Sequence, residues 1–228
     1  MIRTTIHQTW RIRARVLAVP LLGCLLLLAC GEPEPPTVNL YRAIHVGDLN
    51  QIKRHLHWGT DVNQPDPDGD MPLHVAARRG RVVIAEELLA HGAEVDARNA
   101  AGRTPLQVAL IQGKTQLARV LLKQGAQEDP QSLLFLLARE GVSDRDSLDL
   151  LVELGADVNT PNEVGSTPLH VAVADNHLLV TKRLVDLRAD VNARDGEGRT
   201  PLAIAVSAGY GDIVAALEPF GARLDQAE

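Results

Sequence analysis

Thiols and aromatic rings are both scarce in this chain. Its 228 residues include two cysteines and only two residues each of tryptophan, tyrosine and phenylalanine. So few rings leave little to stack against nucleic-acid bases, and a formal net charge of −6 is the opposite of a basic, phosphate-binding surface. A nucleic-acid partner is therefore not expected. Cys24 and Cys30 both lie near the amino terminus, so the rest of the chain has no thiol for a disulfide framework.

Long apolar runs are absent except near the amino terminus. Residues 16–29 are almost wholly apolar, and the residues before them carry four arginines and no acidic side chain. A basic start, a short apolar run and small residues before a cleavage point are typical of a secretory signal. The run is shorter than the roughly 20 residues of a membrane span. We therefore expect residues 1–29 to be a signal peptide, with an uncleaved signal anchor as the alternative.

The end of this run, Leu27-Leu28-Ala29-Cys30, resembles the lipobox of bacterial lipoproteins. The resemblance implies cleavage before Cys30, diacylglycerol on its sulfur and a further acyl chain, palmitate, on its new amino group. Two or more acyl chains give stable anchoring where one gives marginal binding. Gly31 stands where Asp would signal retention in the inner membrane. The family rule therefore implies the outer membrane. We expect the domain to face the periplasm, although the sequence leaves this orientation open.

A charged, proline-rich segment separates Cys30 from the rest of the chain. Glu32–Pro36 reads Glu-Pro-Glu-Pro-Pro, which cannot form a core and predicts a semi-extended spacer over residues 30–37. At about 3.1 Å per residue, the seven residues that follow the cysteine reach roughly 20 Å. Loss of residues 1–29 would leave 19 basic and 29 acidic side chains, a net charge of −10.

One sequence unit recurs along the remaining chain. Thr-Pro-Leu or the longer Met/Thr-Pro-Leu-His-Val-Ala opens the copies at residues 71–76, 104–106, 167–172 and 200–202. The interval from Pro72 to Pro105 is 33 residues, and so is the interval from Pro168 to Pro201. One alanine of the first helix aligns six copies: Ala43, Ala76, Ala109, Ala138, Ala172 and Ala205.

A period of that length with this motif resembles the ankyrin repeat. The resemblance implies an all-α solenoid of six stacked repeats, each a helix-turn-helix unit with a projecting hairpin tip, and commonly a monomer. The motif also has its own physical reasons, because Thr caps a helix start and Pro is preset for the first helical position. No repeat buries its apolar face alone, so we expect one domain over residues 38–228. Its repeats are expected at 38–69, 70–102, 103–129, 130–165, 166–198 and 199–228.

Glycines are expected wherever a turn needs a positive φ. Gly80, Gly113 and Gly209 fall between the two helices of their repeats, and a second glycine ends most of the second helices. In the fifth repeat Arg188 replaces that second glycine.

The fourth repeat departs from the pattern. Gly125 to Ala138 is 13 residues, where Gly92 to Ala109 is 17, and Pro130-Gln131-Ser132 replaces the usual turn. One hairpin tip is therefore expected to be short or absent. A tolerated loop deletion and a notch that shapes the binding surface both remain open.

No reaction centre or cofactor site is evident in the sequence. The ankyrin resemblance implies that His74 and His170 are structural. His55 and His57 are two residues apart on a helix and point to different sides, which argues against zinc. Asp66–Asp70 lacks a full calcium loop and falls at a turn, where Asp and Gly are ordinary. We expect no catalytic residue, no metal and no cofactor.

Ankyrin domains bind proteins through hairpin tips and the exposed side of the first helices. Carried over position by position, the resemblance implies partner contacts at Asp68, Asp70, Arg78, Arg79, Arg98, Arg103, Gln112, Glu163, Arg194, Glu197 and Arg199. The arginines of the second and third repeats, together with Arg81, form a local positive cluster that suits an acidic partner.

These features predict a non-enzymatic interaction module, lipid-anchored in the bacterial cell envelope, that stabilises, localises or inhibits another envelope protein. Two alternatives stay open: an immunity-type inhibitor of an envelope-targeting toxin, and a structural spacer. The sequence leaves the identity of the partner undetermined.

Overall fold

The computed structural model describes residues 32–224. The predicted signal peptide at 1–29, the lipid site at Cys30 and the last residues, 225–228, lie outside this range. From Glu34 onward the described chain forms one compact unit. Within residues 32–224 no helix reaches the length and hydrophobicity of a membrane span.

The described residues contain twelve α-helices, one 3₁₀ turn and no β-strand. The helices are α1 (Leu40–Val46), α2 (Leu49–His57), α3 (Pro72–Arg79), α4 (Val82–Ala90), α5 (Pro105–Ile111), α6 (Thr115–Lys123), α7 (Pro130–Glu140), α8 (Arg145–Glu153), α9 (Pro168–Ala174), α10 (Leu178–Asp186), α11 (Pro201–Ala208) and α12 (Gly211–Leu217), followed by η1 (Glu218–Phe220).

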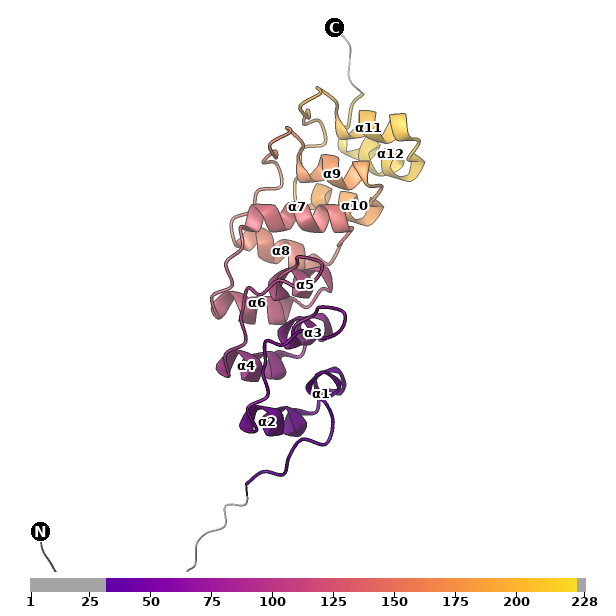
Figure 1. Ribbon diagram of the computed structural model, residues 1–228. Coiled ribbons are helices and arrows are strands. Elements are labelled where there is room, and N and C mark those ends of the chain that lie inside the picture. Colours follow the sequence, from indigo (N-terminus) through magenta and orange to yellow (C-terminus); the bar gives the residue numbers. More distant parts are fainter. Residues whose placement is uncertain (1–31, 225–228) are drawn as a thin grey trace, which may run out of the picture. The chain divides into compact units, whose positions relative to one another are not determined.

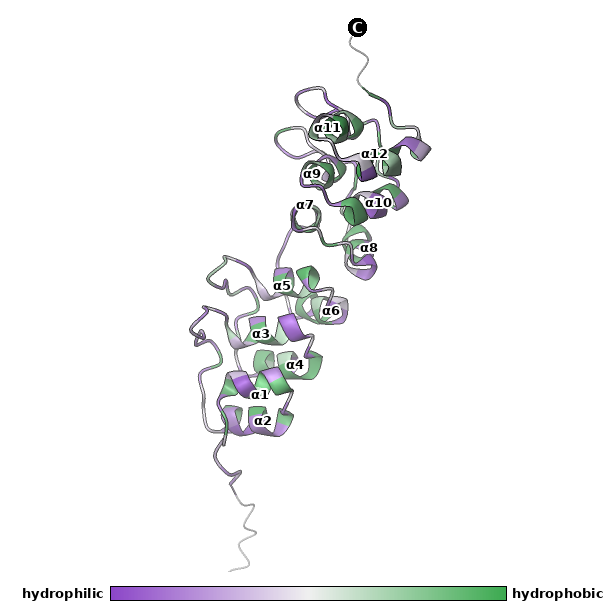
Figure 2. Ribbon diagram, turned by 90° about the vertical axis from the view of Figure 1, so that its right-hand side faces the viewer, coloured by the Kyte–Doolittle hydropathy of each residue, from purple (hydrophilic) through white to green (hydrophobic). Residues whose placement is uncertain are grey.

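The helices form two layers of stacked pairs (Figure 1). The odd-numbered first helices contact one another in sequence order, and most neighbouring even-numbered second helices do so too. Hydrophobic and hydrophilic residues share the same helices (Figure 2), and the apolar residues form one buried core that includes members of every helix pair. The all-α stack of six repeats predicted from the sequence is confirmed.

The Thr-Pro motif begins helices as predicted. The Thr104 hydroxyl oxygen accepts a hydrogen bond from the Gln107 N–H at 3.3 Å, and Pro105 is the first residue of α5. The Gln107 side-chain oxygen accepts in return from the Thr104 N–H at 3.3 Å. This reciprocal capping box satisfies two of the N–H groups that a helix start leaves unpaired.

Both kinds of turn have the backbone conformation that was expected. Gly80, Gly113 and Gly209 have φ values of 64°, 62° and 74°. Arg188, which replaces a glycine at the end of α10, is also held in the left-handed region, at φ 72°. A side chain at such a φ costs roughly 1–2 kcal/mol, because Cβ approaches the following carbonyl.

Asparagine side chains join one repeat to the next on the side of the second-helix ends. Asn192 donates from Nδ2 to the Gly221 carbonyl at 3.0 Å and accepts from the Arg223 N–H at 2.8 Å. Asn63 and Asn159 make the same two bonds with their own following repeats. These bonds fix the spacing of the stack independently of the apolar core.

The fourth repeat keeps its helix pair but not its register. Measured back from the left-handed glycine that ends the first helix, Leu137 stands four residues before Gly141, as Ala76 stands four before Gly80. The alignment on Ala138 was therefore wrong by one residue. Leu137 is fully buried, and its larger side chain keeps α7 from approaching α5 as closely as α3 does. In agreement, α5 and α7 share a smaller contact than other neighbouring first helices.

The turn inside the fourth repeat is also longer. α4 begins two residues after Gly80, whereas α8 begins four residues after Gly141. Asp144 caps α8 by accepting from the Ser147 N–H at 2.9 Å.

Candidate functional site

Each regular hairpin tip is fixed by one Asp or Asn side chain. Asn99 Oδ1 accepts from the N–H groups of Ala101 and Arg103, two and four residues ahead, at 3.1 and 2.9 Å. Asp66, Asn162 and Asp195 do the same in their own tips. The carboxylate of Asp66 is therefore a turn-forming group. The regular tips therefore share one hydrogen-bonded loop conformation.

The tips pack against one another in two pairs. The Ala100 N–H donates to the Gly69 carbonyl at 3.2 Å. This bond joins the second tip, residues 66–70, to the third tip, residues 99–103. In the other pair, a Cβ on Gly196 would lie 2.4 Å from the Val164 carbonyl oxygen of the fifth tip. Only a glycine fits there, so the fifth and sixth tips are in backbone contact. The fourth repeat contributes no tip between the two pairs.

Most of the predicted contact residues are at the surface. Arg103 is half-buried. Nine are exposed: Asp68, Arg78, Arg79, Arg98, Gln112, Glu163, Arg194, Glu197 and Arg199.

Asp70 was predicted to lie on the binding surface, and the structure buries it. Only 5% of its surface is exposed. Its carboxylate pairs with Arg78 Nη2 at 2.5 Å and accepts from Asn99 Nδ2 at 2.7 Å. Asp70 therefore holds α3 and two tips together and is not available to a partner.

Several of the predicted contact arginines are also engaged within the chain. Arg103 pairs with Glu140 at 2.7 Å. Arg98 and Arg194 each donate to the carbonyl four residues ahead, at 2.7 Å. These side chains brace the tips, so they are weaker candidates for partner contacts than their exposure suggests.

Arg199 donates two N–H groups to one carboxylate oxygen of Asp195 at the sixth tip. The Nε and Nη2 atoms of Arg199 lie 3.0 and 2.9 Å from Asp195 Oδ2. Burial works against ionisation of Asp195, but the hydrogen bonds from Arg199 outweigh it and hold the pKa of the carboxyl below its usual value. Arg199 also pairs with Glu197 at 3.0 Å.

Arg79 is a predicted contact arginine that stays unneutralised. Its Nη2 donates to His45 Nε2 on α1 at 2.5 Å, and no carboxylate among the described residues pairs with it. Arg81, beside it, donates to the carbonyls of His45 and Val46, both at 3.2 Å, at the end of α1. α1, α3 and α5 contain no acidic residue. Positive charge is therefore concentrated where α1 and α3 end.

The two motif histidines are structural, as the resemblance implied. His74 Nε2 donates to the Arg103 carbonyl at 2.8 Å, and its Nδ1 accepts from the Met71 N–H at 3.3 Å. His170 bridges to the Arg199 carbonyl at 3.1 Å in the same way. Burial lowers the pKa of both rings. Within residues 32–224 no group of three or more His, Cys, Asp or Glu side chains is placed to hold a metal ion.

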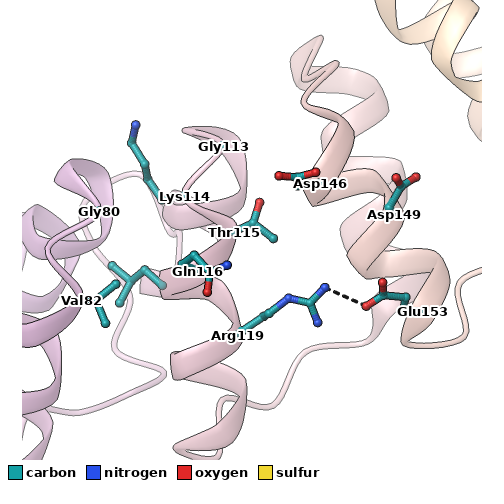
Figure 3. A pocket seen from close by; sticks show the side chains of 11 residues that line it. Gly80, Val82, Gly113, Lys114, Thr115, Gln116, Arg119, Asp146, Asp149 and Glu153 are labelled. Atoms are coloured by element: carbon teal, nitrogen blue, oxygen red, sulfur yellow. Dashed lines mark hydrogen bonds and ion pairs between the residues drawn. The ribbon is translucent and has the colours of Figure 1, made fainter.

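A cleft of about 380 Å³ opens between the second helices of the third and fourth repeats (Figure 3). Arg119 of α6 points across it toward Glu153 of α8, whereas Lys114, the residue before α6, lies against Gly80. Arg119 pairs with Glu153 at 2.8 Å. The cleft follows from the displaced fourth repeat, and its lining carries two basic and three acidic side chains.

A second cleft, of about 580 Å³, lies where the fourth tip is missing. Its lining residues come from α7 and from the fifth tip: Gln131, Ser132, Phe135, Arg139, Pro161, Asn162, Glu163 and Val164. Of the two interpretations of the shortened segment, this cleft favours the notch. Of these lining residues, only Glu163 was among the predicted contacts. Alignment of the fourth repeat on Ala138 shifts Arg139 by one position, so its equivalence to Arg78 was missed. Registration on Gly141 would have matched Arg139 with Arg78.

The repeats account for most of the chain in comparisons with known proteins. The family model "Ankyrin repeats (3 copies)" matches residues 40–132 and 134–227. This chain belongs to the ankyrin-repeat family. As in the family, its repeats form a protein–protein interaction module on a scaffold that is generally non-enzymatic.

Three relatives illustrate the likeness. The ankyrin repeat domain of human ASB11 is 27% identical, with a TM-score of 0.64 over 84% of this chain and 87% of that one. A chain from the complex of a predatory endopeptidase of Bdellovibrio bacteriovorus with an immunity protein is 26% identical. Its TM-score is 0.60, over 79% of this chain and 96% of that one.

The mouse 60 kDa lysophospholipase is 46% identical over 170 residues, which is 68% of this chain but 30% of the mouse protein. The chain spans 30% or less of the length of the curated relatives that it matches.

Proposed function

We propose that this ankyrin-repeat protein is a non-enzymatic interaction protein of the bacterial cell envelope. Lipid on Cys30 anchors it, and it binds another envelope protein that it stabilises, localises or inhibits. The observation that carries the proposal is the exposed, unneutralised Arg79 beside His45 and Arg81 on the first-helix side of the stack. Because the chain as a whole is acidic, this local positive charge favours an acidic patch on the partner.

The amino-terminal sequence supports the envelope part of the proposal. A basic start, an apolar run and Leu27-Leu28-Ala29-Cys30 resemble a lipoprotein signal, and a proline-rich spacer follows. Lipid on Cys30 would tether the repeats within roughly 20 Å of the bilayer surface, since the spacer extends by about 3.1 Å per residue. We propose the outer membrane, with the repeats facing the periplasm.

Inhibition of a toxin is the second candidate function. It is favoured by one observation, the similarity to a chain from a complex of a predatory endopeptidase with an immunity protein. In this alternative the first-helix surface would cover the active site of an enzyme that acts in the envelope. A structural spacer without a specific partner is the third.

Charge reversal at Arg79 tests the binding surface. The full chain with a carboxyl-terminal tag would be captured from envelope extract as wild type, as Arg79→Glu and as Lys123→Glu. Lys123 is exposed at the end of α6, on the opposite layer, and undergoes the same change of charge. Arg103 is left unchanged, because a glutamate there would face Glu140.

We expect one stoichiometric partner with the wild type and with Lys123→Glu, and at least about ten-fold less with Arg79→Glu at an unchanged melting temperature. A periplasmic hydrolase as partner would favour the inhibitor. Equal capture with all three chains would move the binding surface elsewhere, and no specific capture with any of them would leave the structural spacer.

Cys30→Ser tests the anchor. The wild-type chain should partition with membranes and carry the added mass of the acyl chains, whereas Cys30→Ser should keep its amino-terminal segment and lose that mass. An unmodified Cys30 in the mature wild-type protein would refute lipid anchoring and leave protein binding untouched.

A further inference from the structure

The second tip shows how this array holds a carboxylate. Asp70, the residue before the α3 N-cap, places its carboxylate between Arg78 of its own repeat and Asn99 of the next tip. The Nη2–Oδ2 distance is 2.5 Å and the Nδ2–Oδ1 distance is 2.7 Å. One cation and one amide N–H therefore converge on a single acidic group.

The fourth and fifth repeats keep the same two donors. Arg139 stands two residues before Gly141, as Arg78 stands two before Gly80. Asn162 corresponds to Asn99, since its Oδ1 accepts from the N–H groups two and four residues ahead, at 3.1 and 2.9 Å. Glu128, which precedes the α7 N-cap as Asp70 precedes that of α3, accepts instead from Thr104 Oγ1 and Gln107 Nε2 at 2.9 and 3.2 Å. Among the described residues, no carboxylate pairs with Arg139 or Asn162 Nδ2 in the way that Asp70 pairs with Arg78 and Asn99.

Both donors are unengaged. Among the described residues, neither the Arg139 guanidinium nor Asn162 Nδ2 has a hydrogen-bond or ion-pair partner. Both side chains line the cleft of about 580 Å³. The Glu163 N–H is likewise unbonded, whereas the equivalent Ala100 N–H of the third tip donates to the Gly69 carbonyl of the tip before it at 3.2 Å.

We propose that this cleft recognises an acidic surface turn of a partner protein, which takes the place of the missing fourth tip. An Asp or Glu carboxylate of the partner lies between Arg139 and Asn162, and a backbone carbonyl of the turn accepts from the Glu163 N–H. Phe135 and Val164 contact an apolar side chain of the partner next to this carboxylate, and Val164 is 70% exposed. The inference deepens the proposed function and rests on it.

The chemistry of the cleft selects an acid over a base. Arg139, Asn162 Nδ2 and the Glu163 N–H are all donors. The side-chain oxygen of Asn162 is already occupied by two N–H groups of its own tip. Hydrogen bonds to a charged acceptor are stronger than neutral ones, so the carboxylate is the group that gains most. The Glu163 carboxylate opposes an acidic ligand, so this residue contributes through its backbone N–H alone.

The chain supplies the probe for a test. A cyclic peptide that copies residues 65–71 contains the second tip and the Asp70 carboxylate. Binding to the full chain would be followed through the side-chain amide signals of Asn162 and the backbone amide of Glu163, with the same peptide carrying Asp70→Asn as the control ligand. Asn162→Asp is the protein variant, and its tip should fold because Asp66 and Asp195 hold the same position in other tips.

We expect both sets of amide signals to shift with the wild-type peptide. The affinity should fall about ten-fold or more with the Asp70→Asn peptide, with Asn162→Asp and with Arg139→Gln, but not with Lys123→Gln. Binding that is unchanged by all four substitutions, or no shift at Asn162 and Glu163, would overturn the proposal.

Capture from envelope extract distinguishes failure of the cleft from failure of the proposed function. A partner that binds wild type and Asn162→Asp equally, yet is lost with Arg79→Glu, would refute the cleft and leave the proposed function standing. Absence of any partner would remove the function, whatever the peptide does.

Discussion

Arg188 is held in a backbone conformation that suits glycine, and Arg188→Gly should therefore stabilise the protein. The residue has φ 72°, and its counterparts Gly92 and Gly155 have φ 88° and 100°. Removing Cβ relieves roughly 1–2 kcal/mol of left-handed strain. The greater freedom of glycine in the unfolded chain offsets about 0.5–1 kcal/mol of that gain. The net expectation is an increase of about 0.5–1 kcal/mol in the free energy of unfolding.

The bond from Asn159 Nδ2 to residue 188, at 3.3 Å, goes to the backbone carbonyl and survives the substitution. For a domain of this size the melting temperature should rise by about 1–4 °C, measured by calorimetry and by urea titration.

Two controls isolate the backbone effect. Arg188→Ala removes the same charge and the same long side chain but keeps Cβ, so its stability should stay close to that of the wild type. Gly155→Ala is the reverse experiment at an equivalent position. No atom lies within 4 Å of a Cβ built there, so its expected loss of about 1 kcal/mol comes from φ alone. The reasoning fails if Arg188→Gly is no more stable than Arg188→Ala.

Two further predictions concern groups that join neighbouring repeats. Burial lowers the pKa of His74 in the folded state, so the unfolded chain binds protons first and the free energy of unfolding should fall as the pH drops below about 6.5. His74→Gln, which copies Gln107 of α5, should flatten that dependence in urea titrations from about pH 8 to pH 5, and an unchanged slope would contradict the assignment. Asn192→Ala removes both bonds to the last repeat and should cost about 1–2 kcal/mol. Asn192→Asp retains the acceptor for the Arg223 N–H and should cost less, so equal losses would show that the Nδ2 bond contributes nothing.

The regular repeats were predictable because short local motifs start and end each of their first helices. Thr104 and Pro105 start a helix, and Gly113 ends it in a turn, whatever the rest of the chain does. The fourth repeat was harder, because the apolar run at residues 133–137 directly before Ala138 allows more than one helical register. The positive φ of Gly141 identifies the correct register. The apolar pattern alone does not predict this backbone angle.

The binding surface was only partly predictable from the sequence. Asp70 sits in a polar turn and looks exposed, yet its partners are Arg78 and Asn99, 8 and 29 residues away. Assigning contact residues from the family motif assumes that every tip residue faces solvent. It does not reveal a tip carboxylate that pairs with other repeats of the same chain. Arg139 and Asn162 show the same limit from the other side, since their significance lies in the partner that they lack.

The smaller contact between α5 and α7 also bears on how the protein loses its structure. In a stack of repeats each unit is stabilised by its own folding and by the interfaces with its two neighbours. Unfolding is therefore expected to divide the stack into two cooperative blocks at its weakest interface. The tips reinforce this division, because the second pairs with the third and the fifth with the sixth, with none between. Stretched between its ends in a single-molecule experiment, the protein should lengthen in two separate steps, one for each block of three repeats.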